Sequence, residues 1–190
     1  MKKTFSSLLA FALLGSASLF AGTYNVDPEH STVGFKVKHM MISDVSGKFD
    51  TFSGVIHYDE KTKTLKELNG KVDVHSINTA NEKRDAHLKA PDMFDAQKYP
   101  LITFALDKVK GDKAYGKLTM HGVTKNVVLD YEHNGLIKDP WGNQRIGLGL
   151  SGKINRKDYG ITWNKAIEAG GVAVGETVKL DIQLEGILAK

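Results

Sequence analysis

The stretch DVHSINTANEKRDAHLKAPDMFDAQKYPLITF, residues 73–104, is the one long interruption in a chain that otherwise alternates apolar and polar residues. Within it, residues 80–89 suit a helix that Asn78 or Thr79 can cap and that Pro91 ends. A helical insertion that carries apolar residues and lies between strands is positioned to close the mouth of something hollow. The rest of the chain decides whether such a hollow exists.

Around the insertion, apolar residues recur with a period of two, which predicts strands. The predicted strands cover residues 33–39, 45–58, 68–74, 101–106, 114–120, 127–131, 146–154 and 178–184. The apolar parity of the second strand changes near Thr51, which predicts a bulge. Tight turns join nearly all the strands, and an up-and-down antiparallel sheet of this size usually closes to remove its edges. The predicted fold is all-β, an eight-stranded antiparallel barrel with a short helical insertion between strands 3 and 4.

Five glycines fall on the apolar parity of these strands. They are Gly47, Gly54, Gly70, Gly116 and Gly152. One interpretation is that they let strands bend at barrel corners. Taken together, the array favours the other interpretation, in which they leave space inside and the lumen is hollow and apolar.

Residues 1–21 have the features of a secretory signal peptide, which leaves residues 22–190 as one mature domain. A basic start precedes the apolar run 8–14, and small residues follow it. We expect cleavage after Ala21, with cleavage after Ala17 as the alternative. The apolar run is too short to span a bilayer, so the sequence predicts an exported protein.

The composition excludes several kinds of site. The chain has no cysteine, which excludes a disulfide scaffold and a cysteine-ligated metal. The formal net charge of +4 falls to +2 when Lys2 and Lys3 leave with the signal, and the remaining basic residues are interspersed with acidic ones. We therefore expect no nucleic-acid partner.

Neither metal binding nor catalysis has a motif in this sequence. The seven histidines never occur with the H-x-H or HExxH spacing of metal sites, and His39, the best single candidate, is more typical of a hydrogen-bonded strand end. No G-x-S-x-G elbow, phosphate-binding loop or dinucleotide fingerprint occurs. The pairs Asp158–Tyr159 and Asp85–His87 have no nucleophile beside them. We predict no catalytic residue and no metal site.

Several blocks of the sequence resemble the YceI-like family in their order and spacing, over essentially the whole mature chain. The blocks are YNVDPEHS at 24–31, VGFKVKH at 33–39, GKF at 47–49, SINT at 76–79, Asn81, RD at 84–85, HLK at 87–89, Asp92, FD at 94–95, KYP at 98–100, ITF at 102–104, GKLTMHGVTK at 116–125 and INRKDYG at 154–160. Ala90 and Met93 stand where we expect Ser and Phe, and both changes keep a small or apolar residue.

The resemblance implies a lipocalin-like barrel that binds a polyisoprenoid or similar long-chain lipid. For this chain it implies a periplasmic carrier that sequesters such an amphiphile in its lumen, with a link to envelope stress, transient membrane contact and a homodimeric state. No cofactor is expected apart from a bound lipid such as a polyprenyl chain or an isoprenoid quinone. The alternatives are an enzyme that acts on a lipid-like substrate and a stress-related protein-binding module.

The predicted lumen is lined by inward-facing residues of the strands and by residues of the insertion and loops. They are Phe35, Val37, His39, Phe49, Val72, Val74, Met93, Phe94, Phe104, Leu118, Met120, Leu148, Leu150, Tyr159, Trp163, Leu180 and Ile182. The apolar pattern alone is more typical of a filled core, and the resemblance reverses that expectation.

Asn81, Arg84 and His87 of the insertion are the candidates for contact with a polar headgroup. The alternative, which we favour, is that Arg84 and Asp85 pin the helix to strand ends through hydrogen bonds to backbone groups.

Overall fold

The computed structural model describes residues 21–168 and 170–190, so the predicted signal peptide lies outside the described residues except for its last residue, Ala21. The strands are β1 (Ala21–Val26), β2 (Thr32–His39), β3 (Ser43–Phe49), β4 (Phe52–Asp59), β5 (Thr64–Asp73), β6 (Ile77–Asn78), β7 (Leu101–Lys110), β8 (Lys113–Met120), β9 (Val123–Lys138), β10 (Gln144–Asn155) and β11 (Val174–Leu188). Helix α1 covers Glu82–Leu88, and two 3₁₀ turns cover Val74–Ser76 (η1) and Arg156–Tyr159 (η2). No helix in the described part of the chain combines the length and the apolar character that crossing a bilayer requires.

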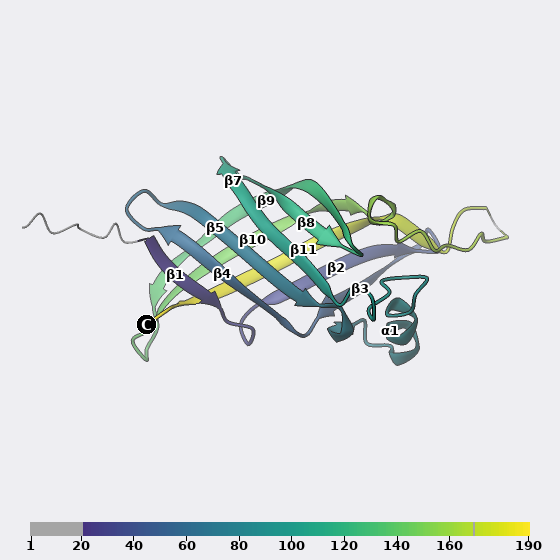
Figure 1. Cartoon of the computed structure of the whole chain (residues 1–190), viewed down its shortest axis with the longest axis horizontal. Helices are drawn as coiled ribbons and strands as arrows, with labels where there is room; N and C mark the ends of the chain where they lie inside the picture. The colour runs from purple at the N-terminus through teal and green to yellow at the C-terminus, as the bar shows by residue number, and fades with distance from the viewer. Residues whose placement is uncertain (1–20, 169) are drawn as a thin grey trace, which may run out of the picture.

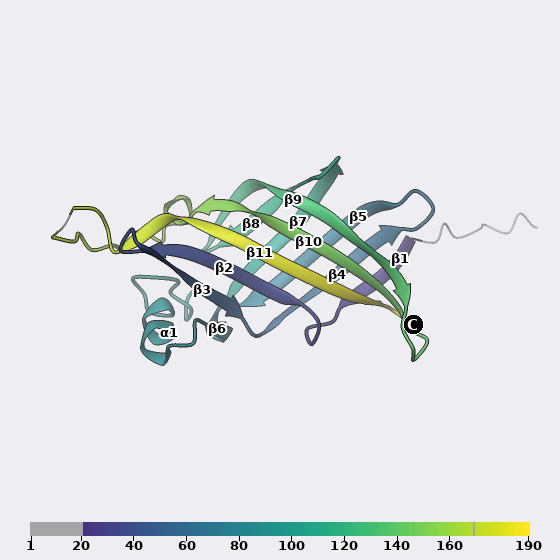
Figure 2. The ribbon, with the colours of Figure 1, turned by 180° about the vertical axis from the view of Figure 1, so that it is seen from behind.

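Eight antiparallel strands close a barrel in the order β1, β4, β5, β7, β8, β9, β10 and β11, and β11 pairs back to β1. One edge of β11 has two neighbours, because β1 pairs with residues 186–188 while β2 pairs with residues 174–183. Strands β2 and β3 therefore extend the wall beyond the end of β1, on the side where the insertion lies (Figures 1 and 2). The predicted fold class is confirmed, including the place of the insertion.

The membership of the barrel differs from the prediction in two places. Strand β1 has no predicted counterpart, because its apolar alternation extends only from Tyr24 to Val26. The predicted strand 45–58 is two strands. β3 pairs with β2 and ends before Asp50–Thr51, and β4 then pairs with β1 and β5. The predicted bulge is thus a corner between strands, and the up-and-down order holds only from β4 to β11.

The insertion folds against the edge of β3, where β6 pairs with the end of that strand (Figure 2). The cap of α1 is Asn81, not Asn78 or Thr79 as predicted, and its Oδ1 accepts a hydrogen bond from the backbone N of Arg84 at 3.0 Å. Asn78 is engaged elsewhere, because its Nδ2 donates to Oδ2 of Asp50 at 2.7 Å. The helix is consequently shorter than the predicted 80–89.

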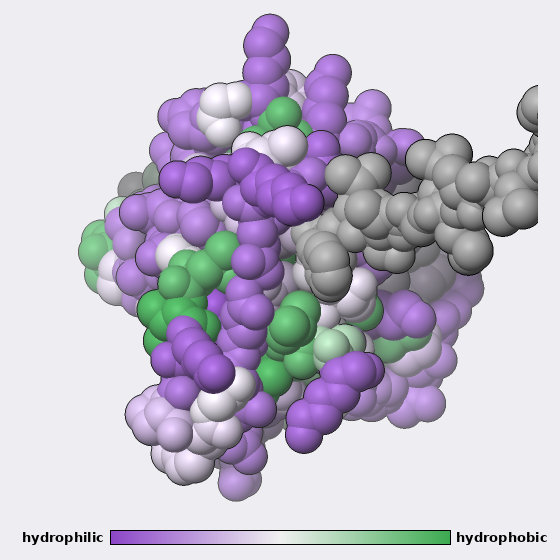
Figure 3. All heavy atoms as spheres, turned by 90° about the vertical axis from the view of Figure 1, so that its left-hand side faces the viewer, coloured by the Kyte–Doolittle hydropathy of each residue, from purple (hydrophilic) through white to green (hydrophobic). Residues whose placement is uncertain are grey.

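Two apolar clusters fill the two ends of the barrel. One lies near the chain termini, around Tyr24, Ile56 and Ile146, and the other lies under the insertion, around Ile77 and Tyr159. The end that carries the termini presents a mostly hydrophilic face, on which apolar residues form small groups separated by polar ones (Figure 3). The interior between the clusters is where a hollow can exist.

The turn between β2 and β3 has an unusual backbone. The backbone N of Ile42 donates to the carbonyl of His39 at 3.2 Å, and the two central residues, Met40 and Met41, have φ of 47° and 64°. These values make a type I′ turn, which favours Asn and Gly. A left-handed conformation costs an L-residue about 1–2 kcal/mol, so this Met-Met pair lowers the stability of the fold.

Candidate functional site

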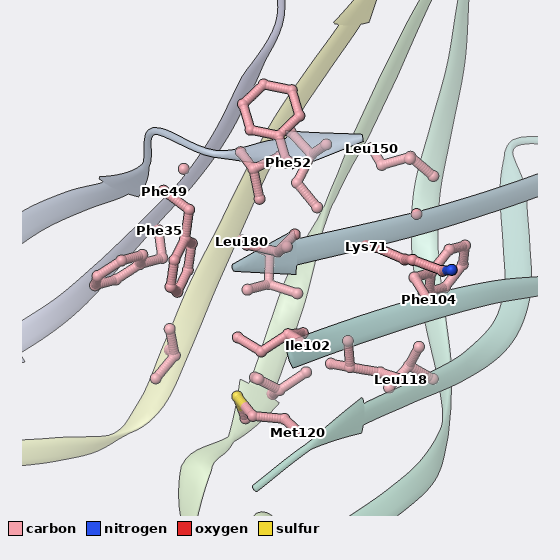
Figure 4. Close-up of a pocket in the computed structure, with 18 of the residues that line it drawn as sticks. Phe35, Phe49, Phe52, Lys71, Ile102, Phe104, Leu118, Met120, Leu150 and Leu180 are labelled. Carbon is pink, nitrogen blue, oxygen red and sulfur yellow. The ribbon is translucent and has the colours of Figure 1, made fainter. Parts of the chain in front are cut away.

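An apolar cavity lies inside the barrel, and its wall is almost entirely carbon (Figure 4). Its volume is about 180 Å³, and it is partly open. Such a wall offers water almost no hydrogen-bond partners, and apolar cavities of this kind stay dry. The arrangement is therefore suited to an apolar occupant.

Most of the predicted lumen residues lie on this wall. They are Phe35, Val37, Phe49, Val72, Met93, Phe94, Phe104, Leu118, Met120, Leu150, Leu180 and Ile182. The strand residues among them share the inward parity of β2, β3, β5, β7, β8, β10 and β11, as alternation requires. Met93 and Phe94 come from the insertion, which therefore forms part of the wall and not only a cover.

Five predicted lumen residues do not line the cavity. Leu148 is fully buried in the cluster near the termini, and Val74 and Tyr159 are fully packed in the cluster under the insertion. His39 is the last residue of β2 and pairs with Val174, while the Trp163 ring lies edge-on to His87 with centroids 4.9 Å apart. Alternation identifies an inward face but not the depth at which packing ends and the cavity begins.

The wall also includes residues that the sequence analysis did not select. They are Val26, Val33, Gly34, Phe52, Ser53, Gly54, Leu68, Gly70, Lys71, Leu88, Ile102, Val127, Leu129, Ile154, Arg156, Ile161, Val174, Val178 and Leu184. Most of those on predicted strands, such as Ile102 and Leu129, share the inward parity and were available to the pattern. Gly34, Ser53 and Lys71 have the opposite parity. Leu88, Ile161 and Val174 reach the wall from a helix, a loop and a strand end, where no period of two exists.

The inward glycines do not all leave space. A Cβ on Gly47 would lie 2.4 Å from the Phe35 ring, and one on Gly116 would lie 2.6 Å from the Phe104 ring. The prediction that these glycines hollow the lumen is wrong for those two positions, because aromatic rings occupy the room. At Gly70 the nearest atom to such a Cβ is 4.0 Å away, so this position does open the wall.

Three phenylalanines connect the sheet to the insertion at the cavity. The ring centroids of Phe35 and Phe49 are 5.7 Å apart, and Phe49 meets Phe94 edge-on at 6.3 Å. Figure 4 shows Phe35 and Phe49 side by side on neighbouring strands. Edge-to-face contacts of this kind add about 0.5–1.5 kcal/mol beyond burial, so they hold the insertion against the wall.

The three candidate headgroup residues make local contacts within the insertion. Asn81 caps α1, and Arg84 donates to Thr79 twice, from Nε to Oγ1 and from Nη2 to the backbone carbonyl, each at 2.7 Å. Nε2 of His87 lies 3.0 Å from Oδ2 of Asp92. These contacts match the structural alternative for Arg84, and none of the three residues lines the cavity.

Arg156 is a buried cation on the cavity wall. It is 4% exposed, and its Nε, Nη1 and Nη2 donate to the backbone carbonyls of Gly175, Ile161 and Val174 at 2.9, 2.7 and 3.3 Å. Burial lowers the pKa of this guanidinium below its ordinary value. The arginine joins Ile161, just after η2, to the start of β11, where the Val174 carbonyl also accepts a hydrogen bond from Nδ2 of Asn164 at 2.8 Å.

Replacing Arg156 with Ala should lower the free energy of unfolding by roughly 3–5 kcal/mol, because the carbonyls of Gly175, Ile161 and Val174 each lose a hydrogen bond from a buried, charged donor. Chemical denaturation measures this loss. Lys157→Ala is the matched control, since its ion pair with Glu176 is exposed and is worth roughly 0–1 kcal/mol. Equal losses in the two variants would contradict a structural role for Arg156.

At the opposite end of the barrel, the Arg145 guanidinium joins three carboxylates. Its Nε lies 2.8 Å from Asp139, and its Nη1 lies 2.8 Å from Asp27 and 2.5 Å from Glu185. Oxygen atoms of Asp27 and Glu185 also approach a ring nitrogen of His30, the kind of grouping that can hold a metal ion. Because both carboxylates already form ion pairs with Arg145, we interpret the group as an ion-pair network.

Arg145, with donors from Asn143 and Trp141, lowers the pKa of Asp139 to about 2. A carboxyl with a lowered folded-state pKa stabilises the fold above its ordinary pKa and loses that contribution as the pH falls. The free energy of unfolding should therefore decline between about pH 4 and pH 2, and Asp139→Asn should flatten this decline in denaturant titrations. An unchanged slope in the variant would assign the acid sensitivity to other groups.

The comparisons with known proteins agree on one family. A family profile described as the YceI-like domain matches residues 24–186. A UPF0312 protein of Staphylococcus aureus strain MSSA476 is 39% identical over 163 residues, which are 85% of this chain and 95% of the relative. The crystal structure of the Campylobacter jejuni YceI protein is 36% identical with a TM-score of 0.71, and it covers 80% of this chain and 90% of its own.

Two more distant structures share the fold. Burkholderia cenocepacia BcnA has a TM-score of 0.72 at 20% identity, over 84% of this chain and 98% of its own. A domain from Saccharophagus degradans, described as polyisoprenoid binding and implicated in plant cell wall breakdown, has a TM-score of 0.65 at 18% identity, over 87% and 98%.

Proposed function

The chain belongs to the YceI-like family, and from that premise we propose that its barrel holds the apolar tail of a long-chain amphiphile, with the headgroup left outside. The observation that carries the proposal is the carbon-walled cavity, because a site with almost no polar lining selects for an apolar chain and not for a headgroup. The polyisoprenoid binding described for the Saccharophagus degradans domain supports an isoprenoid or a similar lipid as the occupant.

The role we propose is that of a periplasmic carrier. The signal-like residues 1–21 support export, and the cavity supports sequestration of a lipid without a covalent step. An isoprenoid quinone and a polyprenyl chain both have tails of the required chemistry. Nothing in the cavity pairs a nucleophile with a base, so a binding role is favoured over catalysis on a lipid.

The cavity volume sets the length of tail that fits inside. An apolar cavity of about 150 Å³ accepts a ring of six carbons, so 180 Å³ encloses roughly seven carbons. Each buried CH₂ contributes about 0.8 kcal/mol, which gives on the order of 6 kcal/mol before the cost of ordering the tail. A longer tail must extend past the enclosed part of the barrel.

Affinity should therefore rise with tail length and then level off. In a series of saturated fatty acids of increasing length, each added CH₂ should tighten binding about fourfold until about seven carbons are enclosed. Calorimetry or displacement of a fluorescent fatty acid measures the series. An affinity that does not change with tail length would contradict an apolar tail site.

Filling the cavity from its wall gives a second test. Gly70→Leu should place a side chain in the open space beside the glycine and weaken fatty-acid binding at least about tenfold, because it removes several tail contacts. The control is Asn69→Leu, which adds the same side chain at the preceding, exposed position of β5. Equal affinity in the two variants would place the tail elsewhere.

A further inference from the structure

The turn between β2 and β3 exposes three consecutive large apolar side chains. Met40, Met41 and Ile42 are 45%, 58% and 85% exposed. In Figure 1 this turn lies at the right-hand end of the barrel, opposite the chain termini. Exposed apolar residues are common singly, but three in a row at the tip of a hairpin mark a contact surface.

The backbone of this turn shows that folding does not require these residues. The two central positions have positive φ, where Asn and Gly are favoured, yet both are methionine. A turn selected only for stability would carry neither of them. The apolar side chains therefore serve a contact outside the fold.

A neighbouring loop supports the turn from one side. The backbone N of Met40 donates to the carbonyl of Ala173 at 2.8 Å. A Cβ on Gly171 would lie 3.2 Å from Cγ of Met41, so the methionine packs over that glycine. The loop holds the turn in place and leaves its apolar tip facing outward.

The turn adjoins the wall of the tail cavity. Val37, which lies on β2 three residues before Met40, lines the cavity. Val174, at the start of β11, also lines it and pairs with His39, the last residue of β2. The turn therefore begins directly beyond this end of the cavity. An apolar tail that enters or leaves here meets the exposed methionines and Ile42 next.

We propose that Met40, Met41 and Ile42 insert into a lipid bilayer and hold this end of the barrel against it. This inference rests on the proposed function, because a protein that carries a membrane-soluble tail must exchange it with a bilayer. Flexible, polarizable methionine side chains adapt to the irregular packing of lipid chains. Short apolar segments bind such surfaces reversibly in proportion to the apolar area they bury.

The test replaces Met40-Met41 with Asn-Gly, the pair that a type I′ turn favours. The double variant M40N/M41G should raise the melting temperature by a few degrees, since it relieves two unfavourable backbone conformations. It should also lower the partition onto vesicles of phosphatidylethanolamine and phosphatidylglycerol at least about tenfold, because two apolar side chains are lost. Co-sedimentation with the vesicles measures the partition, and a loss of binding in a more stable protein cannot come from unfolding.

Two further variants and one separate readout make the result decisive. Ile42→Ser should also weaken vesicle binding, whereas Trp141→Ser, which removes the 80% exposed side chain at the opposite end, should not. Two results would overturn the inference. One is wild-type protein that stays in the supernatant when the vesicles sediment, and the other is a M40N/M41G variant that binds the vesicles as well as wild type does. Tip-dependent dimerisation without vesicle binding would overturn it in favour of a second copy of the chain. Fatty-acid binding measured without vesicles should be the same in wild type and variants, and its failure in the wild type would instead reject the proposed function.

Discussion

The barrel depends on one constraint. Nearly all the inward-facing side chains of its strands are apolar, and they do not fill the space that they enclose. Close packing takes over at both ends, around Tyr24 and Ile146 near the termini and around Ile77 and Tyr159 under the insertion. Between these clusters the wall is almost entirely carbon. A protein interior normally packs to crystal-like density, so an unfilled apolar space lowers stability and is retained when an occupant needs it.

The width of the barrel at its far end follows from the pairing of β11. Near Leu188 this strand is next to β1, but from Gln183 back to Val174 its neighbour is β2. The sheet therefore opens between β3 and β7, and the insertion from η1 to Pro100 fills that opening. Leu88, Met93 and Phe94 reach the cavity only because a helix and its loops complete the wall there.

Alternation along the chain was enough to predict the fold class, because a closed sheet has one inside, and it identified ten strand residues that line the cavity. It did not distinguish Leu150, on the wall, from Leu148, in solid core, since both have the same parity on β10. The prediction that the inward glycines leave space failed for a related reason. Gly47 and Gly116 make room for the rings of Phe35 and Phe104, and cross-strand neighbours of this kind are set by register, which a single sequence does not specify.

The proposed function requires that the cavity carry a tail in the cell. Native mass spectrometry of the protein purified from its own host, without detergent, measures this directly. We expect a bound species of several hundred daltons that organic solvent removes, and its extracted form should be a molecule with a long apolar chain. Protein that carries no such species, and that takes none up when offered its host's extracted lipids, would contradict the claim.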